Sequence, residues 1–282
     1  MNIMRKKSWW LVGGGIGACC VAALLLFPKE SQPELPAAAS RDYAEIVAEG
    51  VIHAVTEYNS VSFYVSNDTL SGFHYALIEA FAQAHGLKAD VVPEMSFDKR
   101  LEGLNAGKYD VIAYSLLATS ELKDSIALTR PVALNKEVLV QRKAEADSSL
   151  FIKSQLELAG KTLHVVKGSP TILRIHNLGD EIGDTIYIKE VDQYGPEQLI
   201  ALVAHGDIDY AVCDESIARA LADSLPQIDI STDISFTQFY AWGVNKQAPQ
   251  LLDSINVWLD NFVETPAYKA IYRKYMASSR LP

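Results

Sequence analysis

The chain has 282 residues, enough for one large domain or for two lobes that each have a hydrophobic core. Its 35 acidic residues outnumber its 25 basic ones, giving a formal net charge of −10, so it lacks the basic field with which proteins displace counterions from nucleic acids. These numbers exclude a nucleic-acid partner. With 49% hydrophobic residues, the composition is ordinary for a globular protein.

The first element in chain order is an uncharged apolar run of twenty residues, 8–27, preceded by Arg5, Lys6 and Lys7. A run of this length can span a bilayer, and the positive charges before it place the N-terminus in the cytoplasm. We therefore expect residues 1–27 to be a signal-anchor or a signal peptide. The rest of the chain then lies on the periplasmic side of the inner membrane.

Three fates of this segment stay open. An uncleaved membrane helix is favoured, because the apolar run is longer than the core of a usual signal peptide. Residues 16–19 (IGAC) resemble a lipobox, which would give a lipid anchor at Cys19. Residues 37–40 offer a cleavage site, although far from the apolar run. Residues 28–42, rich in Pro and Ala, are expected to be a tether without fixed structure.

Beyond the tether, apolar runs of strand length alternate with amphipathic segments of helical period. Strands are expected at residues 51–58, 87–94, 109–117, 161–168, 185–191 and 209–214. Helices are expected at residues 72–86, 96–107, 169–179, 195–206 and 215–225, with Ser96 and Ser169 as N-caps. This alternation predicts an α/β fold of parallel strands with helices on both faces.

Two segments 99 residues apart repeat one pattern. Residues 107–115 (GKYDVIAYS) and 206–214 (GDIDYAVCD) both read Gly-x-apolar-Asp followed by a short apolar run. The repeat predicts the same strand element in two similar lobes, each with its own sheet. Residues 135–143 and 239–246 are expected to be strands that cross between the lobes and form a hinge.

The expected bounds follow from this pattern: residues 43–138 and 240–282 form lobe 1, residues 144–237 form lobe 2, and the hinge strands lie near 139–143 and 238–243. In such sheets, ligands bind beyond the carboxyl ends of strands and at helix N-termini. The polar residues expected at these places are Glu57, Tyr58, Ser115, Gly168, Ser169 and Asp214. The free N–H groups of the helix that begins at Gly168 and Ser169 are expected to hold an anionic group.

Five segments, in this order, resemble the bacterial extracytoplasmic solute-binding proteins of family 3, the polar amino-acid receptors of ABC importers. They are residues 72–73, 107–121, 158–169, 206–216 and 267–276. The resemblance implies a two-lobe periplasmic binding protein fold (type II), a small molecule held in the cleft between the lobes, no catalysis, and an inner-membrane permease as a further partner. It also implies that Asp214 pairs with an ammonium group of the ligand and that Phe97 packs against it.

One position departs from the family pattern. Where the receptors have an arginine that clamps the ligand's carboxylate, this chain has Leu122, with Lys123 next to it, and a helping threonine is replaced by Leu117. An ordinary free amino acid therefore fits poorly, and we expect an amine-bearing or peptide-like ligand. The six histidines show no HxH or HxxxH pair, so neither a metal site nor a cofactor is predicted.

Three functions compete at this level. The first is a membrane-tethered receptor that captures a solute for transport or sensing. The second is a non-catalytic regulatory module of cell-wall metabolism that senses peptidoglycan fragments. Membrane-bound lytic transglycosylases carry such a domain ahead of a catalytic one, and we expect this chain to lack the catalytic domain. The third is an enzyme of the dehydratase type, which shares this fold.

Overall fold

The computed structural model describes residues 40–144, 150–192 and 194–276. The chain divides into two units, Met1–Ala37 and Ala38–Pro282, of which the first lies outside the described residues. The expected membrane segment and most of the tether therefore fall outside the described part as well. Among the residues described, no helix is both long and apolar enough to cross a membrane.

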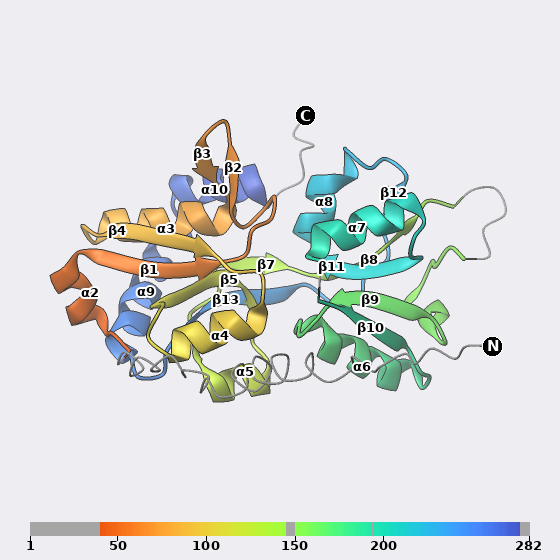
Figure 1. Ribbon diagram of the computed structural model, residues 1–282, viewed down its shortest axis with the longest axis horizontal. Helices are drawn as coiled ribbons and strands as arrows, with labels where there is room; N and C mark the ends of the chain where they lie inside the picture. The colour runs from red at the N-terminus through yellow and green to blue at the C-terminus, as the bar shows by residue number, and fades with distance from the viewer. Residues whose placement is uncertain (1–39, 145–149, 193, 277–282) are drawn as a thin grey trace, which may run out of the picture. The chain divides into compact units, whose positions relative to one another are not determined.

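The first sheet has the strand order β4-β1-β5-β13-β6, with β7 also paired to β13 (Figure 1). Its strands are β1 (Val51–Thr56), β4 (Lys88–Pro93), β5 (Val111–Leu117), β6 (Ala127–Leu128), β7 (Ala133–Asn135) and β13 (Gln238–Val244). β1 runs parallel to both β4 and β5, whereas β13 is antiparallel to β5. A separate hairpin, which the sequence pattern did not predict, joins β2 (Tyr64–Ser66) and β3 (Thr69–Ser71).

Six helices surround this sheet among the described residues of lobe 1. They are α2 (Tyr43–Glu49), α3 (Phe73–Ala84), α4 (Phe97–Asn105), α5 (Ser120–Ser125), α9 (Pro249–Phe262) and α10 (Pro266–Tyr275). Successive residues of β1 show how the faces divide: Ala54 packs with Phe73 and Phe81 of α3, whereas Val55 packs with Leu104 of α4. Alternate side chains of a strand point to opposite faces, so helices cover both sides of the sheet.

The second sheet, in lobe 2, has the order β10-β9-β11-β8-β12. Its strands are β8 (Glu137–Arg142), β9 (Thr162–Val166), β10 (Tyr187–Val191), β11 (Tyr210–Asp214) and β12 (Ile228–Asp229). Its helices are α6 (Thr171–Ile182), α7 (Pro196–His205), α8 (Glu215–Ala222) and the short 3-10 helix η2 (Gln155–Leu158). β11 is parallel to β9 and antiparallel to β8.

The chain passes between the sheets twice. Lys136 alone separates β7 of the first sheet from β8 of the second, and residues 230–237 lead back from β12 to β13. The ammonium of Lys136 lies 2.7 Å from Asp233 Oδ1 and 3.6 Å from Glu215 Oε1, so it ties the two crossings together. β8 and β13, expected to form the hinge, are each a full strand of one sheet.

The repeated sequence pattern occupies equivalent places in the two sheets. Gly107 and Gly206 have φ of 71° and 88°, in the left-handed region that favours glycine. The strands that follow are β5 in the first sheet and β11 in the second. The predicted two-lobe α/β fold is therefore confirmed.

Both predicted serine caps accept a backbone hydrogen bond at the start of a helix. Ser96 Oγ accepts a hydrogen bond from Lys99 N at the start of α4. The α6 range begins at Thr171, but Pro170 before it already has helical backbone angles, so Ser169 is the residue that precedes the first helical one. Its Oγ accepts from Thr171 N over 3.3 Å.

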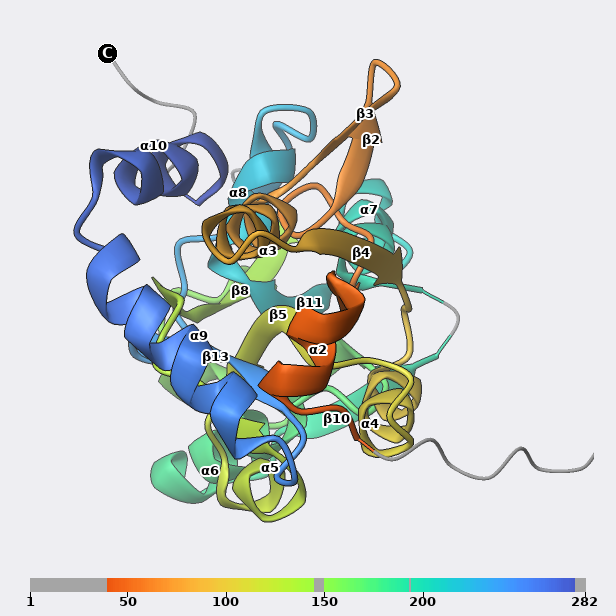
Figure 2. The ribbon, with the colours of Figure 1, turned by 90° about the vertical axis from the view of Figure 1, so that its left-hand side faces the viewer.

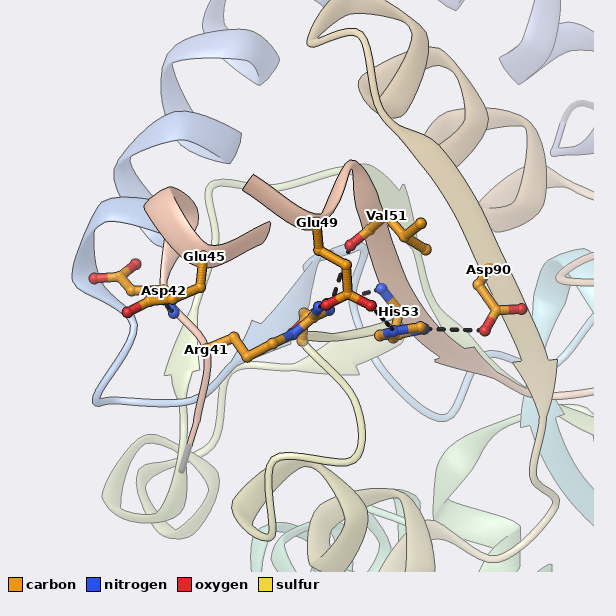
Figure 3. A network of polar contacts seen from close by, with 8 residues as sticks. Arg41, Asp42, Glu45, Glu49, Val51, His53 and Asp90 are labelled. Carbon is orange, nitrogen blue, oxygen red and sulfur yellow. Dashed lines mark hydrogen bonds and ion pairs between the residues drawn. The ribbon is translucent and has the colours of Figure 1, made fainter. Parts of the chain in front are cut away.

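The first described residues are fixed against lobe 1 (Figure 3). Arg41 forms ion pairs with Glu49 and with the buried Asp110. Asp42 caps α2, and the same carboxylate accepts from Leu251 N over 2.8 Å in the first turn of α9. One carboxylate thus satisfies the N-termini of two helices that lie side by side (Figure 2).

Candidate ligand-binding site

A small pocket of about 60 Å³ lies between the two lobes. It is found where the sequence predicted a site, at the carboxyl ends of β1, β5 and β11. Five of the seven predicted residues line it: Glu57, Phe97, Ser115, Ser169 and Asp214. The first three come from lobe 1 and the last two from lobe 2, so the pocket exists only when the lobes face each other.

The other two predicted residues line neighbouring grooves. Tyr58, 46% exposed, lines a groove of about 890 Å³ that shares Glu57 and Met95 with the pocket. Gly168 lines a groove of about 440 Å³ that shares Phe97 and Ser169 with it. The cleft is therefore longer than the pocket at its centre, and both ends are open to an extended ligand.

The two grooves differ in chemistry. The groove at Tyr58 carries five carboxylates and two lysines, which gives it a net negative charge. The groove at Gly168 is mainly apolar, with Leu101, Leu122 and Leu173 among its side chains. A ligand with a positive group at one end and an apolar group at the other would match this difference.

The lobe 2 wall of the pocket contains two buried carboxylates. Asp214, at the end of β11, has Oδ1 buried without a hydrogen-bond partner among the described residues, and the same holds for Oε2 of Glu137 on β8. The hydroxyl of Tyr240 lies 3.4 Å from Glu137 Oε1 and also interacts with Asp214. Although Asp214 precedes α8, its side chain does not cap that helix. These oxygens are left available to a donor that enters the pocket.

Burial changes the proton affinity of this pair. Loss of water raises the pKa of Glu137 to about 7, an effect that the neighbouring hydroxyls of Thr171 and Tyr240 only partly offset. Burial and the neighbouring charge of Glu137 raise the pKa of Asp214 well above its ordinary value. Two carboxylates in this position favour a proton or a cation between them, because each disfavours the charge of the other.

The lobe 1 wall contains a buried ion pair. Arg100 Nη1 lies 3.1 Å from Glu57 Oε2, and both side chains are nearly inaccessible to water. The guanidinium also packs over the ring of Tyr114, with 4.8 Å to its centroid, and over Phe97. Burial raises the pKa of Glu57, and the charge of Arg100 opposes this rise. Arg100 is thus already neutralised by Glu57, although its Nε has no partner among the described residues.

Contacts across the cleft hold the lobes together. The backbone N–H of Ser60, in lobe 1, donates to Glu197 Oε1 of α7 over 2.7 Å. A Cβ added to Gly195 would lie 3.0 Å from Met95 Cε, and one added to Gly168 would lie 3.7 Å from Asp98 Oδ1. Gly195 of lobe 2 therefore allows the lobe 1 surface to approach closely, whereas the distance at Gly168 is an ordinary van der Waals contact.

The expected anion site at the start of α6 is not free for a ligand. The N–H of Gly168 donates to Glu190 Oε2 over 3.0 Å, and that of Ser169 donates to Val166 O over 3.1 Å. Both donors are used because a turn at residues 167–168 bends the chain back onto the end of β10 before the helix begins. Ser169 lines the pocket, but its hydroxyl already donates to Thr171 Oγ1 over 2.8 Å.

Leu122 lies where the resemblance places the missing arginine. It is buried with Leu116 and Ile126, and its backbone N–H donates to the capping Thr119 Oγ1 over 3.2 Å. The carboxylate clamp of related receptors therefore has no counterpart at this position.

Four important pocket residues were not predicted from the sequence: Arg100, Tyr114, Glu137 and Tyr240. A signal existed for two of them. Arg100 lies on the helical stripe of Phe97 and Leu104, where a charged residue is unexpected, and Glu137 directly precedes three apolar strand residues. The two tyrosines were indistinguishable from core residues.

The chain is similar in sequence to proteins of two kinds. It is 29% identical over 226 residues to membrane-bound lytic murein transglycosylase F of Desulfosudis oleivorans, covering 80% of this chain and 48% of that protein. It is 27% identical over 222 residues to a probable histidine-binding protein of Campylobacter jejuni, covering 75% and 79% of the two chains. The chain spans about half the length of the transglycosylase, or less in further relatives of that kind.

The fold has matches among solved structures. An ancestral arginine-binding protein bound to glutamine superimposes with a TM-score of 0.70 at 25% identity, covering 81% of this chain and 99% of that one. The family model of the bacterial extracellular solute-binding proteins, family 3, matches residues 51–278. This match takes in both sheets and the pocket between them. The chain is therefore a member of family 3 of the bacterial extracellular solute-binding proteins.

Proposed function

We propose that this protein is an extracytoplasmic receptor that captures a small amine-bearing ligand in the cleft between its lobes. One observation carries the proposal: Asp214 and Glu137 present unpaired, buried carboxylate oxygens to a pocket between the lobes. Buried carboxylates without partners are costly, and an ammonium group with its hydrogen-bond donors would satisfy them. Capture and closure, without chemistry on the ligand, are the whole function.

The charge of the pocket supports a cationic ligand. Three carboxylates of the pocket lining, on Glu57, Glu137 and Asp214, face two cations, the buried guanidinium of Arg100 and the exposed ammonium of Lys167. The acidic groove at Tyr58 adds to this imbalance. A ligand with one positive charge reduces it, whereas a ligand with an added carboxylate does not.

The relatives indicate the chemical class of the ligand but not its identity. Two of them are described as binding histidine or arginine, which are amines with a carboxylate. Leu122 removes the usual carboxylate clamp from this chain. We therefore expect that no standard amino acid binds in the low-micromolar range, whereas an amine with an apolar body that can contact Phe97 and Tyr58 does.

A thermal-shift screen followed by calorimetry tests the ligand class. The panel contains amino acids, their amides, simple amines, short peptides and muropeptides. Amines and amino-acid amides should stabilise the protein more than the parent amino acids. Tight binding of a simple amino acid such as glutamine, unchanged by Asp214→Asn, would contradict both the ligand class and the site.

The same screen addresses a second function. The similarity to a lytic murein transglycosylase favours a regulatory module that senses peptidoglycan fragments, for which muropeptides would be the strongest stabilisers. Transport would instead require an inner-membrane permease as partner. The binding site is the same in both cases, so the ligand decides between them.

We also propose that residues 1–27 attach the receptor to the inner membrane. The support is the uncharged run at residues 8–27 behind three positive charges. The full-length protein should fractionate with membranes, and a version beginning at residue 40 should remain soluble. Recovery of the full-length product in the soluble periplasmic fraction would indicate cleavage instead.

A further inference from the structure

A chain of three side chains leads from the core of lobe 1 to the pocket. Trp242 Nε1 on β13 lies 2.9 Å from His74 Nδ1 on α3, and His74 Nε2 lies 3.0 Å from Ser115 Oγ on β5. Trp242 and His74 are completely buried, and Ser115 lines the pocket. The histidine thus connects an inaccessible indole to a hydroxyl that a ligand can reach.

The direction of these hydrogen bonds follows from the groups involved. An indole N–H can only donate, so Nδ1 of His74 must accept. Burial lowers the pKa of His74 to about 3, so the ring is neutral and carries one proton. That proton must be on Nε2, and Nε2 therefore donates to Ser115 Oγ.

This direction determines what Ser115 can do. Its oxygen already accepts from His74, so its own hydrogen must go to another acceptor. The hydrogen bonds found in the described part of the chain include no acceptor for that hydrogen. The remaining direction is the pocket, to which Ser115 is exposed.

We infer that Trp242 and His74 fix Ser115 as a hydrogen-bond donor, and that the ligand presents an acceptor oxygen to β5 while its amine faces Asp214. The inference rests on the proposed function and adds a second recognition element to it. Lobe 1 then supplies a donor and lobe 2 supplies acceptors, so one ligand with both groups bridges the cleft.

An acceptor oxygen could belong to a carboxylate or to an amide. The charge of the pocket favours the amide, because both cations of its lining already have carboxylate partners and no arginine stands at Leu122. Arg100 is paired with Glu57, and the ammonium of Lys167 lies 3.5 Å from Asp192 Oδ2. A carboxylate would add negative charge to a pocket that has an excess of it. An amino-acid amide or the first residue of a peptide combines an amine with an uncharged carbonyl oxygen.

Three probes separate these groups: L-leucinamide, L-leucine and isopentylamine, which share one apolar body. Calorimetry with the full-length protein should rank leucinamide as the tightest of the three. Ser115→Ala should weaken the binding of leucinamide about threefold to tenfold, the effect of one lost hydrogen bond, and change the binding of isopentylamine less than twofold.

The matched control is Ser120→Ala, at an exposed serine on α5, which should change the affinity of neither probe. A Ser115-dependent preference for leucine would keep the acceptor and identify it as a carboxylate. Equal losses for leucinamide and isopentylamine would overturn the inference.

The direction of the chain is tested without any ligand. Nitrogen-15 NMR of the free protein should show the His74 proton on Nε2. Trp242→Phe removes the indole donor and should let the Nδ1-protonated form appear, with leucinamide weakened and isopentylamine unchanged. Trp258→Phe in the same lobe is the control. A proton on Nδ1 in the unaltered protein would overturn the inference. If no probe binds, the proposed function loses its support, and the position of this proton still decides the role of Ser115.

Discussion

β5 in lobe 1 and β11 in lobe 2 follow the same sequence pattern and reach the same pocket, but their last polar side chains are supported differently. Ser115 on β5 accepts a hydrogen bond from the neutral His74, which Trp242 holds in place. Asp214 on β11 has one oxygen with no partner among the described residues, and the residue opposite it on β8 is another carboxylate, Glu137. Ser115 is thus oriented by hydrogen bonds within its own lobe, whereas Asp214 keeps one carboxylate oxygen without a hydrogen-bond donor among the described residues.

The difference assigns separate tasks to two similar strands. A neutral donor held by a buried chain costs little when the cleft is empty, because its other bonds are satisfied. An incomplete carboxylate is unfavourable when the cleft is empty and becomes favourable when a cation arrives. Lobe 1 would therefore orient the ligand, and lobe 2 would supply most of the binding energy and the dependence on charge.

The largest expected effect comes from Asp214→Asn. The amide keeps the shape of the side chain but removes the charge, and a hydrogen bond to a charged group contributes about 1.5–3 kcal/mol. Binding of an amine such as leucinamide should therefore fall roughly 10- to 100-fold in calorimetry. The melting temperature should stay the same or rise, because burial disfavours the charge that is removed.

The matched control for this change is Asp207→Asn. Asp207 is an exposed carboxylate in the turn before the same strand, so it carries the same change of charge without facing the pocket. It should alter neither affinity nor stability. A loss of stability in Asp214→Asn, with affinity unchanged, would mean that Asp214 has a structural role.

A smaller effect, a change in ligand affinity of up to about tenfold per pH unit, is expected from the proton that Glu137 and Asp214 share. The groups that face it are Tyr240 from β13, Thr171 from α6 and Glu57, Tyr114 and Arg100 from lobe 1. An ammonium needs ionised carboxylates, and the pKa of Glu137 in the free pocket is raised to about 7. Affinity for an amine should therefore increase as pH rises from 6 to 8.

The stability of the free protein should change in the opposite sense. The folded state holds the Glu137 proton more tightly than the unfolded state, whose ordinary value is 4.5. The stabilisation from this group is present below that value and is lost as pH rises through about 7. Glu137→Gln, measured by calorimetry and thermal melting over this range, should reduce both pH dependences, and burial of Asp214 accounts for what remains. A slope equal to that of the unaltered protein would locate the proton elsewhere.

The strand pattern was readable from the sequence, and so were the places where strands end. Periodicity and the repeated glycines predicted both sheets, because burial of one face imposes a regular pattern on a segment. The partner of Asp214 was not readable, because Glu137 is 77 residues away and joins it only through the antiparallel pairing of β8 with β11. His74 was unreadable for a similar reason: its role depends on Trp242, which is 168 residues away on β13.

The smallest expected effect concerns closure of the cleft around the two strand ends. Glu197 of lobe 2 accepts from the backbone N–H of Ser60 of lobe 1, and this contact exists only when the lobes are together. Its loss in Glu197→Ala should cost about 0.5–1.5 kcal/mol, which corresponds to a twofold to tenfold weaker ligand. The change should appear mainly in the dissociation rate, since an open cleft admits the ligand as before.

Two further variants serve as controls. Glu197→Gln keeps the acceptor oxygen, so its dissociation rate should lie between those of the unaltered protein and Glu197→Ala. Asp180→Ala, on the exposed side of α6, controls for the loss of a charge. Stopped-flow release of leucinamide measures the rate. An unchanged release rate in Glu197→Ala would show that the strand ends, and not the rim of the cleft, determine how long the lobes stay closed.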